Sequence, residues 1–494
     1  MTDKNSKYAI LIIISGFLLR LINIGQPLFD VTKWRQTETA SIARNFYYNE
    51  MNIFYPQILW GGATEGYVGE TEFQLYTFVV ALLYKIFGVH EYLGRLVSIF
   101  AFCGGAFFLY KLARKYIGAQ GAIIALLFYT FNPHIFFYSR AFMPESTMLF
   151  FSIALVYFFS QWIDTERRKD FILMTLCGVS AFLVKIPAVC LGLPLLYLCI
   201  VKYKWKWFLE RKLWIFAILT LLPTALWYIH AIKSNDINGL SFGAFSGKSL
   251  INKEGLGLGF LTNSYFYKKV FYLYIFQRHL IYIGAVFTIV GIFSAIRTKD
   301  LYLFHYWILS QIISFFISAG TSDYHSYYTI TITAPSSIFV AWVIVIYFDR
   351  IKRAKIVHLP ILEKFFVAPV FILMLIMLPL ICHHKIKSKY KPERMVKDMP
   401  IYVAGNKVRK ISPKDALIIT AHWGGPELLY YSDRRGWRME SSKCTIESIE
   451  VLRKQGATWF VSSRVMEINK DVISHLQHDY EVIELTDKYI IAKL

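Results

Sequence analysis

Two carboxylates lie at the edges of apolar segments, where a side chain can do acid–base chemistry. Asp30 follows an apolar run and opens the polar stretch FDVTKWRQTETASIARNF. A carboxylate in a poorly solvated cleft could take a proton from a hydroxyl group. Glu145 lies in YSRAFMPES, where Pro144 ends the preceding helix. Arg140, in the same turn, is a candidate substrate-binding residue. An ion pair of Glu145 with Arg140, or a capping role at the next helix, is the alternative interpretation.

Polar groups that could bind a substrate follow Asp30. Trp34, Arg35 and Gln36 open a stretch whose pattern predicts a helix over 35–50, and Glu72 lies near the end of the same polar region. The alternative is an amphipathic helix lying on a bilayer with solvated charges, with Glu72 as an ordinary helix-start acid.

Basic residues begin or interrupt three later apolar runs. They are Arg95, Lys185 in the string FLVKIPAV, and Arg278 with His279. Such cations could converge on one phosphate, because a low dielectric strengthens their attraction for a departing anion. Alternatively, each side chain snorkels to lipid headgroups. The sequence leaves both interpretations open.

The string SDYHSYYTITITAP, at 322–335, gathers aromatic and titratable side chains at the end of another apolar run. Tyr324, His325 and Tyr328 could donate hydrogen bonds to a phosphate. An interfacial belt of tyrosines is the simpler alternative.

The composition shows whether these residues belong to a soluble protein or to a membrane protein. Of the 494 residues, 56% are hydrophobic and only 18% are charged, which excludes a soluble globule of this size. The net charge of +21 is compatible with nucleic acid, an anionic membrane or an anionic substrate as partner. The placement of the basic residues must decide among these partners.

Most of the positive charge lies in short loops between apolar runs, which predicts that these loops face the cytoplasm. The basic loops lie near 111–115, 167–169, 202–212, 297–299 and 350–355. They share one side only if the apolar segment 73–89 does not cross, so this segment is predicted to be an interfacial or re-entrant helix. Because topology explains the charge, nucleic acid is not an expected partner.

The sequence thus predicts an α-helical polytopic membrane protein with about eleven transmembrane helices, its N-terminus inside and its C-terminus outside. The spans are predicted near 8–19, 95–112, 119–139, 147–163, 171–184, 186–201, 213–230, 279–296, 301–319, 330–348 and 365–382.

Two domains are expected. Residues 1–384 form the transmembrane domain, with outer loops at 25–94 and 231–278. Residues 385–494 alternate short apolar runs with a helical stretch, which predicts a small extracytoplasmic α/β domain.

The order of these features resembles the GT-C membrane glycosyltransferases, in particular the bacterial relatives of protein O-mannosyltransferases and aminoarabinose transferases (PMT/ArnT-like). The resemblance is carried by EFQLYTFVVALLYKIFG, GRLVSIF, YSRAFMPES, FLVKIPA and YHSYYTITITAP. It implies a polyprenyl-phosphate sugar donor and matches Asp30 and Glu145 to the family's two outer acids. Arg95, Lys185 and the His325/Tyr328 element match its phosphate-binding positions.

Two departures from the family pattern affect the acceptor. Glu72-Phe73-Gln74 stands where many relatives have His-Pro-Pro, and Val184 replaces the threonine before Lys185. The type of acceptor, whether lipid, glycan or protein, therefore stays open.

The expected function is transfer of a sugar, with inversion, to an acceptor hydroxyl on the outer face of the cytoplasmic membrane, with Asp30 as base. No metal or other cofactor is predicted, with a divalent ion near Glu145 as the alternative. Membrane lipids are the remaining expected partners. A polytopic transporter or flippase for a lipid-linked sugar is the rival interpretation, although transporters usually place ionisable groups near the midplane.

Overall fold

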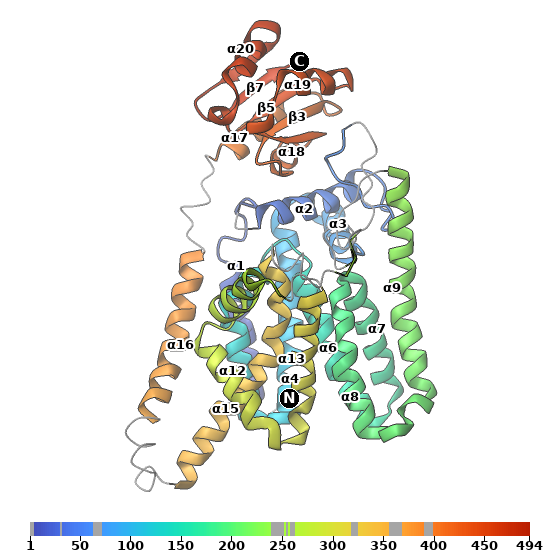
Figure 1. The fold of residues 1–494 in the computed structure, drawn as a ribbon, viewed down its shortest axis with the longest axis vertical. Helices are drawn as coiled ribbons and strands as arrows, with labels where there is room; N and C mark the ends of the chain where they lie inside the picture. The colour runs from blue at the N-terminus through green and yellow to red at the C-terminus, as the bar shows by residue number, and fades with distance from the viewer. Residues whose placement is uncertain are drawn as a thin grey trace. The chain divides into compact units, whose positions relative to one another are not determined.

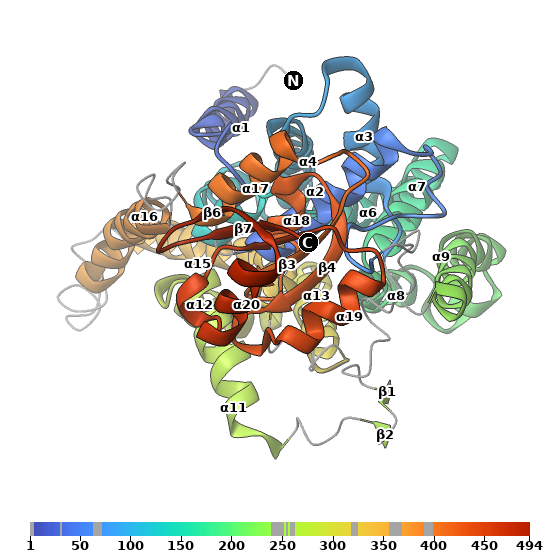
Figure 2. The ribbon, with the colours of Figure 1, turned by 90° about the horizontal axis from the view of Figure 1, so that it is seen from above.

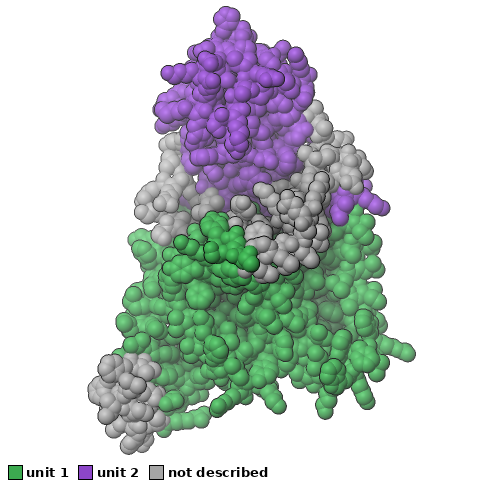
Figure 3. Space-filling view, in the orientation of Figure 1, with its two compact units in different colours: residues 1–24, 95–229, 243–390 green, residues 25–94, 230–242, 391–494 purple. Residues whose placement is uncertain are grey.

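The computed structural model describes residues 4–29, 32–62, 72–238, 251–252, 255–256, 262–317, 325–354, 368–389 and 399–494. The chain divides into two compact units (Figure 3). Unit 1 comprises 1–24, 95–229 and 243–390, and unit 2 comprises 25–94, 230–242 and 391–494. Most of the predicted first outer loop thus forms a compact unit with the C-terminal segment.

Unit 1 is built mainly of long apolar helices, several of them nearly antiparallel (Figure 1). Its elements are α1 (Lys4–Leu21), α4 (Glu91–Phe131), α5 (Pro133–Tyr138), α6 (Glu145–Thr165), α7 (Arg168–Val184), η1 (Ile186–Leu191), α8 (Gly192–Tyr203), η2 (Lys204–Leu209), α9 (Arg211–Asn238), the short strands β1 (Ile251–Asn252) and β2 (Gly255–Leu256), α11 (Ser264–Tyr267), η3 (Lys268–His279), α12 (Ile283–Ser294), η4 (Ala295–Arg297), η5 (Lys299–Leu301), α13 (Tyr302–Ile317), η6 (Ser326–Ile332), α15 (Thr333–Ala354) and α16 (Ala368–Lys389). The first four residues of α4 and the end of α9 belong to unit 2.

The predicted polytopic helical fold is confirmed. In the described part of the chain, seven helices are long and apolar enough to cross a membrane, or eight if the bent pair ending in α12 forms one span. The predicted count of eleven adds α1, α7 and the second half of α4 to these eight. A break at Gly118, where φ is +73°, divides α4 into two helices. Eleven spans therefore stay a prediction.

Helix α3 (Leu75–Phe87) corresponds to the segment that was expected not to cross. Its 13 residues extend about 20 Å, short of the roughly 30 Å of a hydrocarbon core. The length of α3 is consistent with an interfacial helix, and its location at the membrane surface stays a prediction.

The C-terminal part of unit 2 is the expected small α/β domain. Its five strands have the order β4-β3-β5-β7-β6, with β3 parallel to β4 and to β5, and β7 antiparallel to β5 and to β6. The elements are α17 (Pro400–Ile411), β3 (Leu417–His422), α18 (Glu427–Ser432), β4 (Arg435–Glu440), η10 (Ser441–Lys443), α19 (Ile446–Lys454), β5 (Trp459–Ser462), η11 (Val465–Glu467), α20 (Lys470–Asp479), β6 (Glu481–Leu485) and β7 (Ile490–Lys493). The preceding helix α16 runs to Lys389, beyond the boundary expected at 384.

Helices cover both faces of this sheet. Ile449 of α19 and Leu476 of α20 pack with Ile419 and Phe460 in one apolar core. The sheet also contacts α17 and α18, and α2 (Lys33–Tyr48) contacts α18 (Figure 2). A hydrophobic cluster that includes Ile42 joins α2 to α3.

Backbone hydrogen bonds attach the first outer loop to the sheet. Gly436 N donates to Leu59 O (3.0 Å), and the amides of Gly61 and Gly62 donate to Gly436 O at 3.1 and 2.9 Å. Only glycine fits position 436, because a Cβ there would lie 1.9 Å from Ile418 O. The loop therefore continues the sheet beyond β4.

Candidate functional site

Lys185 is placed by a break between two helices of unit 1. Its backbone is extended (φ −154°, ψ 118°) between α7 and η1, and Pro187 follows in the first turn of η1. Proline has no N–H to continue the helical hydrogen bonds. The Lys185 side chain is buried, and its Nζ lies 2.8 Å from Glu145 Oε1.

Glu145 begins α6 directly after Pro144. Its side chain is fully buried, and its Oε2 accepts no hydrogen bond from any described residue. A carboxylate in the first turn is favoured by the partial positive charge of the helix N-terminus. The helix-start interpretation of Glu145 is thus compatible with its position, and its ion-pair partner is Lys185.

The aromatic segment 325–328 approaches Lys185 from another part of unit 1. The Lys185 Nζ lies 5.0 Å from the ring centre of Tyr327 and 4.7 Å from that of Tyr328. His325 stacks on Tyr327 with their ring centres 5.1 Å apart. The structure therefore brings Glu145, Lys185 and Tyr328 together. His325 is stacked on the neighbouring Tyr327.

A buried polar network holds the segment that carries these tyrosines. His279 Nε2, at the end of η3, lies 2.6 Å from Thr329 Oγ1 and 3.2 Å from Ser326 O. Asn132 Nδ2 donates to His279 O at 2.5 Å, and the hydroxyls of Tyr138 and Ser326 are 3.0 Å apart. Buried polar groups joined in this way rigidify their surroundings. The position of η6 is thereby fixed by α5 and η3.

The turn 139–144 before Glu145 is held by two other helices. Arg20 of α1 donates from Nε to Ser139 Oγ at 2.5 Å. Ser98 of α4 donates from Oγ to Ala141 O at 2.7 Å. Arg140 belongs to this turn and is 8% exposed.

Arg95 lies on the same face of α4 as Ser98, because residues three apart are neighbours on a helix surface. Its guanidinium donates from Nη1 to Ile24 O at 2.6 Å. Arg95 therefore lies near the same end of the helices as the turn, while Arg278 stacks on Tyr274 at 5.2 Å from the ring centre. Of the four basic groups, Lys185 is the one that pairs with Glu145 in the described part of the chain.

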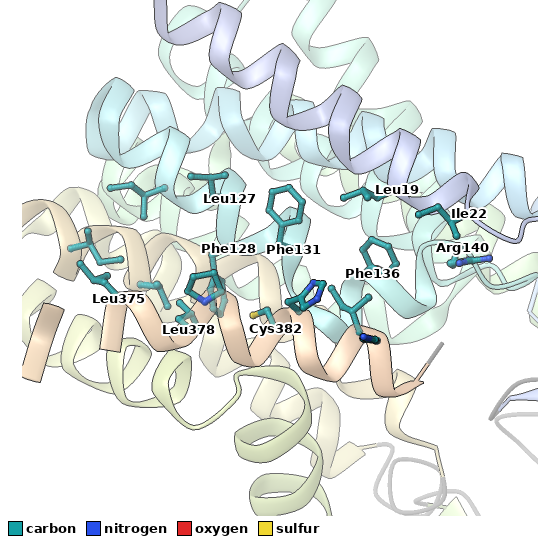
Figure 4. A pocket seen from close by; sticks show the side chains of 17 residues that line it. Leu19, Ile22, Leu127, Phe128, Phe131, Phe136, Arg140, Leu375, Leu378 and Cys382 are labelled. Carbon is teal, nitrogen blue, oxygen red and sulfur yellow. The ribbon is translucent and has the colours of Figure 1, made fainter. Parts of the chain in front are cut away.

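An apolar groove of about 590 Å³ runs along α1, α4, α15 and α16 (Figure 4). Its walls include Leu19, Phe128 and Leu378. Arg140 lies at one end of the groove, beyond Phe136 (Figure 4). Apolar walls with a cation at one end suit a hydrocarbon chain that carries an anionic headgroup.

Four of the other predicted binding residues lie in unit 2, on and beside α2. Arg35 forms an ion pair with Glu72 through its Nη2. Gln36 is fully buried, with Nε2 donating to Thr32 Oγ1 at 3.1 Å, and Trp34 is half-buried. Asp30 and Tyr324 lie outside the described residues.

A buried carboxylate that was not predicted as a site residue lies one turn further along α2. Glu38 is fully buried, and Trp60 Nε1 is 3.1 and 3.2 Å from its two oxygens. Arg438 of β4 stacks on Trp60 at 4.2 Å. Burial raises the pKa of Glu38 to about 7, although Trp60, Arg438 and Arg35 oppose the shift. The spacing Arg35-x-x-Glu38 was the available signal, since it puts both residues on one helix face.

A second buried acid of the C-terminal domain lies close to this cluster. Glu427 Oε2 is 3.0 Å from His422 Nε2. Burial raises the pKa of Glu427, but the hydrogen bond and charge of His422, a backbone hydrogen bond and the charge of Lys33 together lower it below its ordinary value. Among the residues that the structure describes, no group of three or more His, Cys, Asp or Glu side chains could hold a metal ion.

Comparison with known proteins shows likeness to a family, to a relative and to solved structures. Residues 74–230 match the family described as dolichyl-phosphate-mannose-protein mannosyltransferase. An uncharacterised protein of Aquifex aeolicus (strain VF5) is 28% identical over 254 residues, which are 48% of this chain and 58% of that protein. The match thus spans less than two thirds of that relative.

Two solved structures share the fold over nearly the whole chain. ArnT from Cupriavidus metallidurans, bound to undecaprenyl phosphate, has a TM-score of 0.68 at 12% identity, covering 99% of this chain and 98% of ArnT. The oligosaccharyltransferase AglB from Archaeoglobus fulgidus was solved in complex with an inhibitory peptide and a dolichol-phosphate. It has a TM-score of 0.59 at 12% identity, and the match covers 100% of this chain and 75% of AglB. At these identities the likeness concerns the fold.

Proposed function

We propose that this chain is a glycosyltransferase of the PMT/ArnT-like branch of the GT-C superfamily, which its shared fold and its matched segment 74–230 support. It takes a sugar from a polyprenyl-phosphate donor and transfers it to an acceptor hydroxyl. The reaction takes place on the outer face of the cytoplasmic membrane, with the C-terminal domain on the same side.

The apolar groove is the binding site for the polyprenyl chain of this donor. Its lining is almost wholly hydrocarbon, and Arg140 at its end supplies a cation for the phosphate. ArnT was solved with undecaprenyl phosphate, which supports a donor of this class. Arg140 belongs to the turn that leads into Glu145, so only four residues of chain separate the phosphate end of the groove from the Glu145–Lys185 pair.

Lys185 is the group that stabilises the departing phosphate. It is a cation in a buried position, where electrostatic interactions are stronger than in water. Glu145 orients it through their ion pair, and Tyr328 with His325 supplies further hydrogen-bond donors. Arg95 is a further cation of this region, beside Lys185 and Arg140.

Asp30 is the base in this proposal. The acceptor hydroxyl gives its proton to the Asp30 carboxylate, and its oxygen forms a new bond to the anomeric carbon. The bond from that carbon to the phosphate oxygen breaks, and the polyprenyl phosphate leaves with the electron pair. One displacement from the opposite face inverts the anomeric configuration.

Trp34, Arg35, Gln36 and Glu72 bind the acceptor or the sugar hydroxyls. The Arg35–Glu72 pair holds α2 to the segment before α3, which keeps these groups in one place. The observation that carries the whole proposal is the buried Lys185–Glu145 pair at a helix break, facing two tyrosines, in a fold whose solved relative holds a polyprenyl phosphate.

The test replaces Asp30 by Asn in cells that lack the native gene. Mass spectrometry of envelope glycans, lipids and proteins identifies the sugar that wild-type protein restores. Asp30→Asn should lower its transfer about a hundredfold, the low end for general-base catalysis. Glu50→Gln is the control, because Glu50 is an exposed carboxylate in the same loop.

Two outcomes contradict the proposal in different ways. Near-normal transfer by membrane-inserted Asp30→Asn protein excludes Asp30 as the base. Identical sugar content with and without the wild-type protein excludes the glycosyltransferase activity.

A further inference from the structure

Unit 2 contains a small polar pocket of about 110 Å³. Its walls come from the end of α2, the junction of α3 with α4, the end of α17, and α18. A pocket of this volume holds several water molecules, or a polar group of a few heavy atoms. All of its lining residues belong to unit 2: Arg44, Tyr48, Val89, Glu91, Arg409, Tyr430 and Tyr431.

Two half-exposed side chains offer this pocket hydrogen-bond donors that a ligand can reach. The Arg409 side chain is 52% exposed, and its Nε lies 3.6 Å from Asp433 Oδ2. Tyr48, at the end of α2, is 51% exposed. In the part of the chain that the structure describes, neither the Arg409 Nη atoms nor the Tyr48 hydroxyl have a hydrogen-bond partner. Guanidinium and hydroxyl groups of this kind bind phosphate oxygens.

A buried cation lies behind these donors. Arg44 is 5% exposed, its Nη1 donates to Tyr430 O at 3.0 Å, and its Nε lies 3.1 Å from Asp433 Oδ1. Asp433 thus pairs with the Nε side of both guanidinium groups and leaves the Nη side of Arg409 toward solvent. The charge of Arg44 acts on a ligand over a short distance, because the pocket is poorly solvated.

Glu91 gives the same pocket a negative end. Burial raises the pKa of Tyr430, and the charge of Glu91 raises it further. Burial also raises the pKa of Tyr48, and the charge of Arg409 is among those that oppose this shift. Glu91 therefore lies near Tyr430, and Arg409 lies near Tyr48.

Opposite charges at two ends favour a ligand that carries both. A simple anion would be attracted by Arg409 and repelled by Glu91, and a simple cation would meet the reverse. A phosphate joined to a primary ammonium by a short linker suits both ends. Its phosphate accepts hydrogen bonds from guanidinium and hydroxyl groups, and its ammonium donates to a carboxylate. Phosphoethanolamine has this composition.

The neighbouring helices indicate where such a ligand comes from. Glu91 is the first residue of a helix that is long and apolar enough to cross a membrane. Helix α3 exposes Val79, Leu82 and Ile86, and their spacing of three and four residues puts them on one face. Acyl chains can cover an apolar helix face of this kind at a bilayer surface. A membrane lipid therefore explains both the pocket and the exposed face beside it.

We propose that this pocket binds the headgroup of a lipid of the phosphatidylethanolamine class. Arg409 and Tyr48 hold the phosphate, supported by the charge of Arg44, and Glu91 accepts a hydrogen bond from the ammonium. The lipid anchors unit 2 to the bilayer at the start of α4. This inference is independent of the glycosyltransferase activity, because it uses no residue of the proposed donor site.

The experiment measures lipid binding to purified, delipidated full-length protein by native mass spectrometry. Equal amounts of phosphatidylethanolamine, phosphatidylglycerol and phosphatidylcholine compete for the protein. Wild type should bind phosphatidylethanolamine about tenfold better than either competitor. Phosphatidylglycerol has no ammonium for Glu91, and the trimethylammonium of phosphatidylcholine has no N–H to donate.

Three variants separate the two ends of the pocket. Arg409→Gln should lower binding of phosphatidylethanolamine about tenfold, since it removes a charge-assisted hydrogen bond. Tyr48→Phe should lower it about threefold, and it keeps the ring, so folding is preserved. Glu91→Gln should leave phosphatidylglycerol binding unchanged and reduce the preference for phosphatidylethanolamine to about one.

Two matched controls lie outside the pocket. Lys410→Gln removes the exposed cation next to Arg409 on α17, and Glu447→Gln removes an exposed acid of α19. Both variants should bind the three lipids as wild type does. Loss of the preference in either control overturns the assignment to the pocket.

The remaining outcomes each test one part of the inference. Equal binding of the three lipids by wild type overturns the site. Unchanged binding in both Arg409→Gln and Tyr48→Phe overturns the phosphate contacts, and a preference retained by Glu91→Gln overturns the ammonium contact. If soluble O-phosphoethanolamine binds delipidated wild type as tightly as the lipid does, the membrane source of the headgroup is wrong.

Discussion

Breaking the buried ion pair between Lys185 and Glu145 should cost several kcal/mol of stability. The two charged atoms are 2.8 Å apart, and the side chains are 7% and 0% exposed. Coulomb's law at this distance, with an effective dielectric constant of about 20, gives an attraction of about 6 kcal/mol, which desolvation partly offsets. Lys185→Met leaves the Glu145 carboxylate buried without its cation, so the free energy of unfolding should fall by about 3–5 kcal/mol.

The double variant Lys185→Met/Glu145→Gln separates structure from function. It removes both charges, and its stability should return to within about 1 kcal/mol of wild type, because paired buried charges contribute little net stability. Binding of undecaprenyl phosphate should not return, since the proposed phosphate cation is gone. Chemical unfolding in micelles measures the first quantity, and lipid binding in nanodiscs measures the second.

A matched exposed pair provides the control for this cycle. Lys115 and Asp164 lie 2.6 Å apart, but their side chains are 23% and 54% exposed. Removing the cation of this exposed pair should lower the free energy of unfolding by less than about 1 kcal/mol. Wild-type stability of Lys185→Met refutes the buried pair, and recovery of lipid binding in the double variant refutes the phosphate role of Lys185.

Two further predictions concern unit 2. Burial raises the pKa of Glu38 from 4.5 to about 7, so between these values the unfolded state loses a proton that the folded state keeps, and stability falls by about 3 kcal/mol as pH rises. Glu38→Gln should flatten this slope in hydrogen exchange of α2 between pH 5 and 8, and an unchanged slope contradicts the assignment. Gly436→Ala should cost about 3 kcal/mol or more by overpacking, because its Cβ would lie 1.9 Å from Ile418 O. Limited proteolysis should then cut the first outer loop faster, and wild-type protection contradicts its attachment to the sheet.

The sequence alone was sufficient for the helical membrane fold and for the α/β character of the C-terminal segment. Hydropathy and the alternation of short apolar runs are local properties, readable within windows of about 20 residues. The GT-C resemblance also depended on local strings in a fixed order. The break at Lys185 was visible for the same reason, since Pro187 lies two residues away.

Only the tertiary structure decided which of these residues meet. Lys185 contacts Glu145, which precedes it by 40 residues, and Tyr328, which follows it by 143 residues. No local sequence pattern encodes such pairings. Glu38 looked like one charge on an amphipathic helix, yet Trp60 and Arg438 enclose it. The first outer loop joins the C-terminal sheet through Gly436, so both lie in one compact unit although over 300 residues separate them. Burial and contact partners depend on how distant segments pack, and that information appears only when the chain is folded.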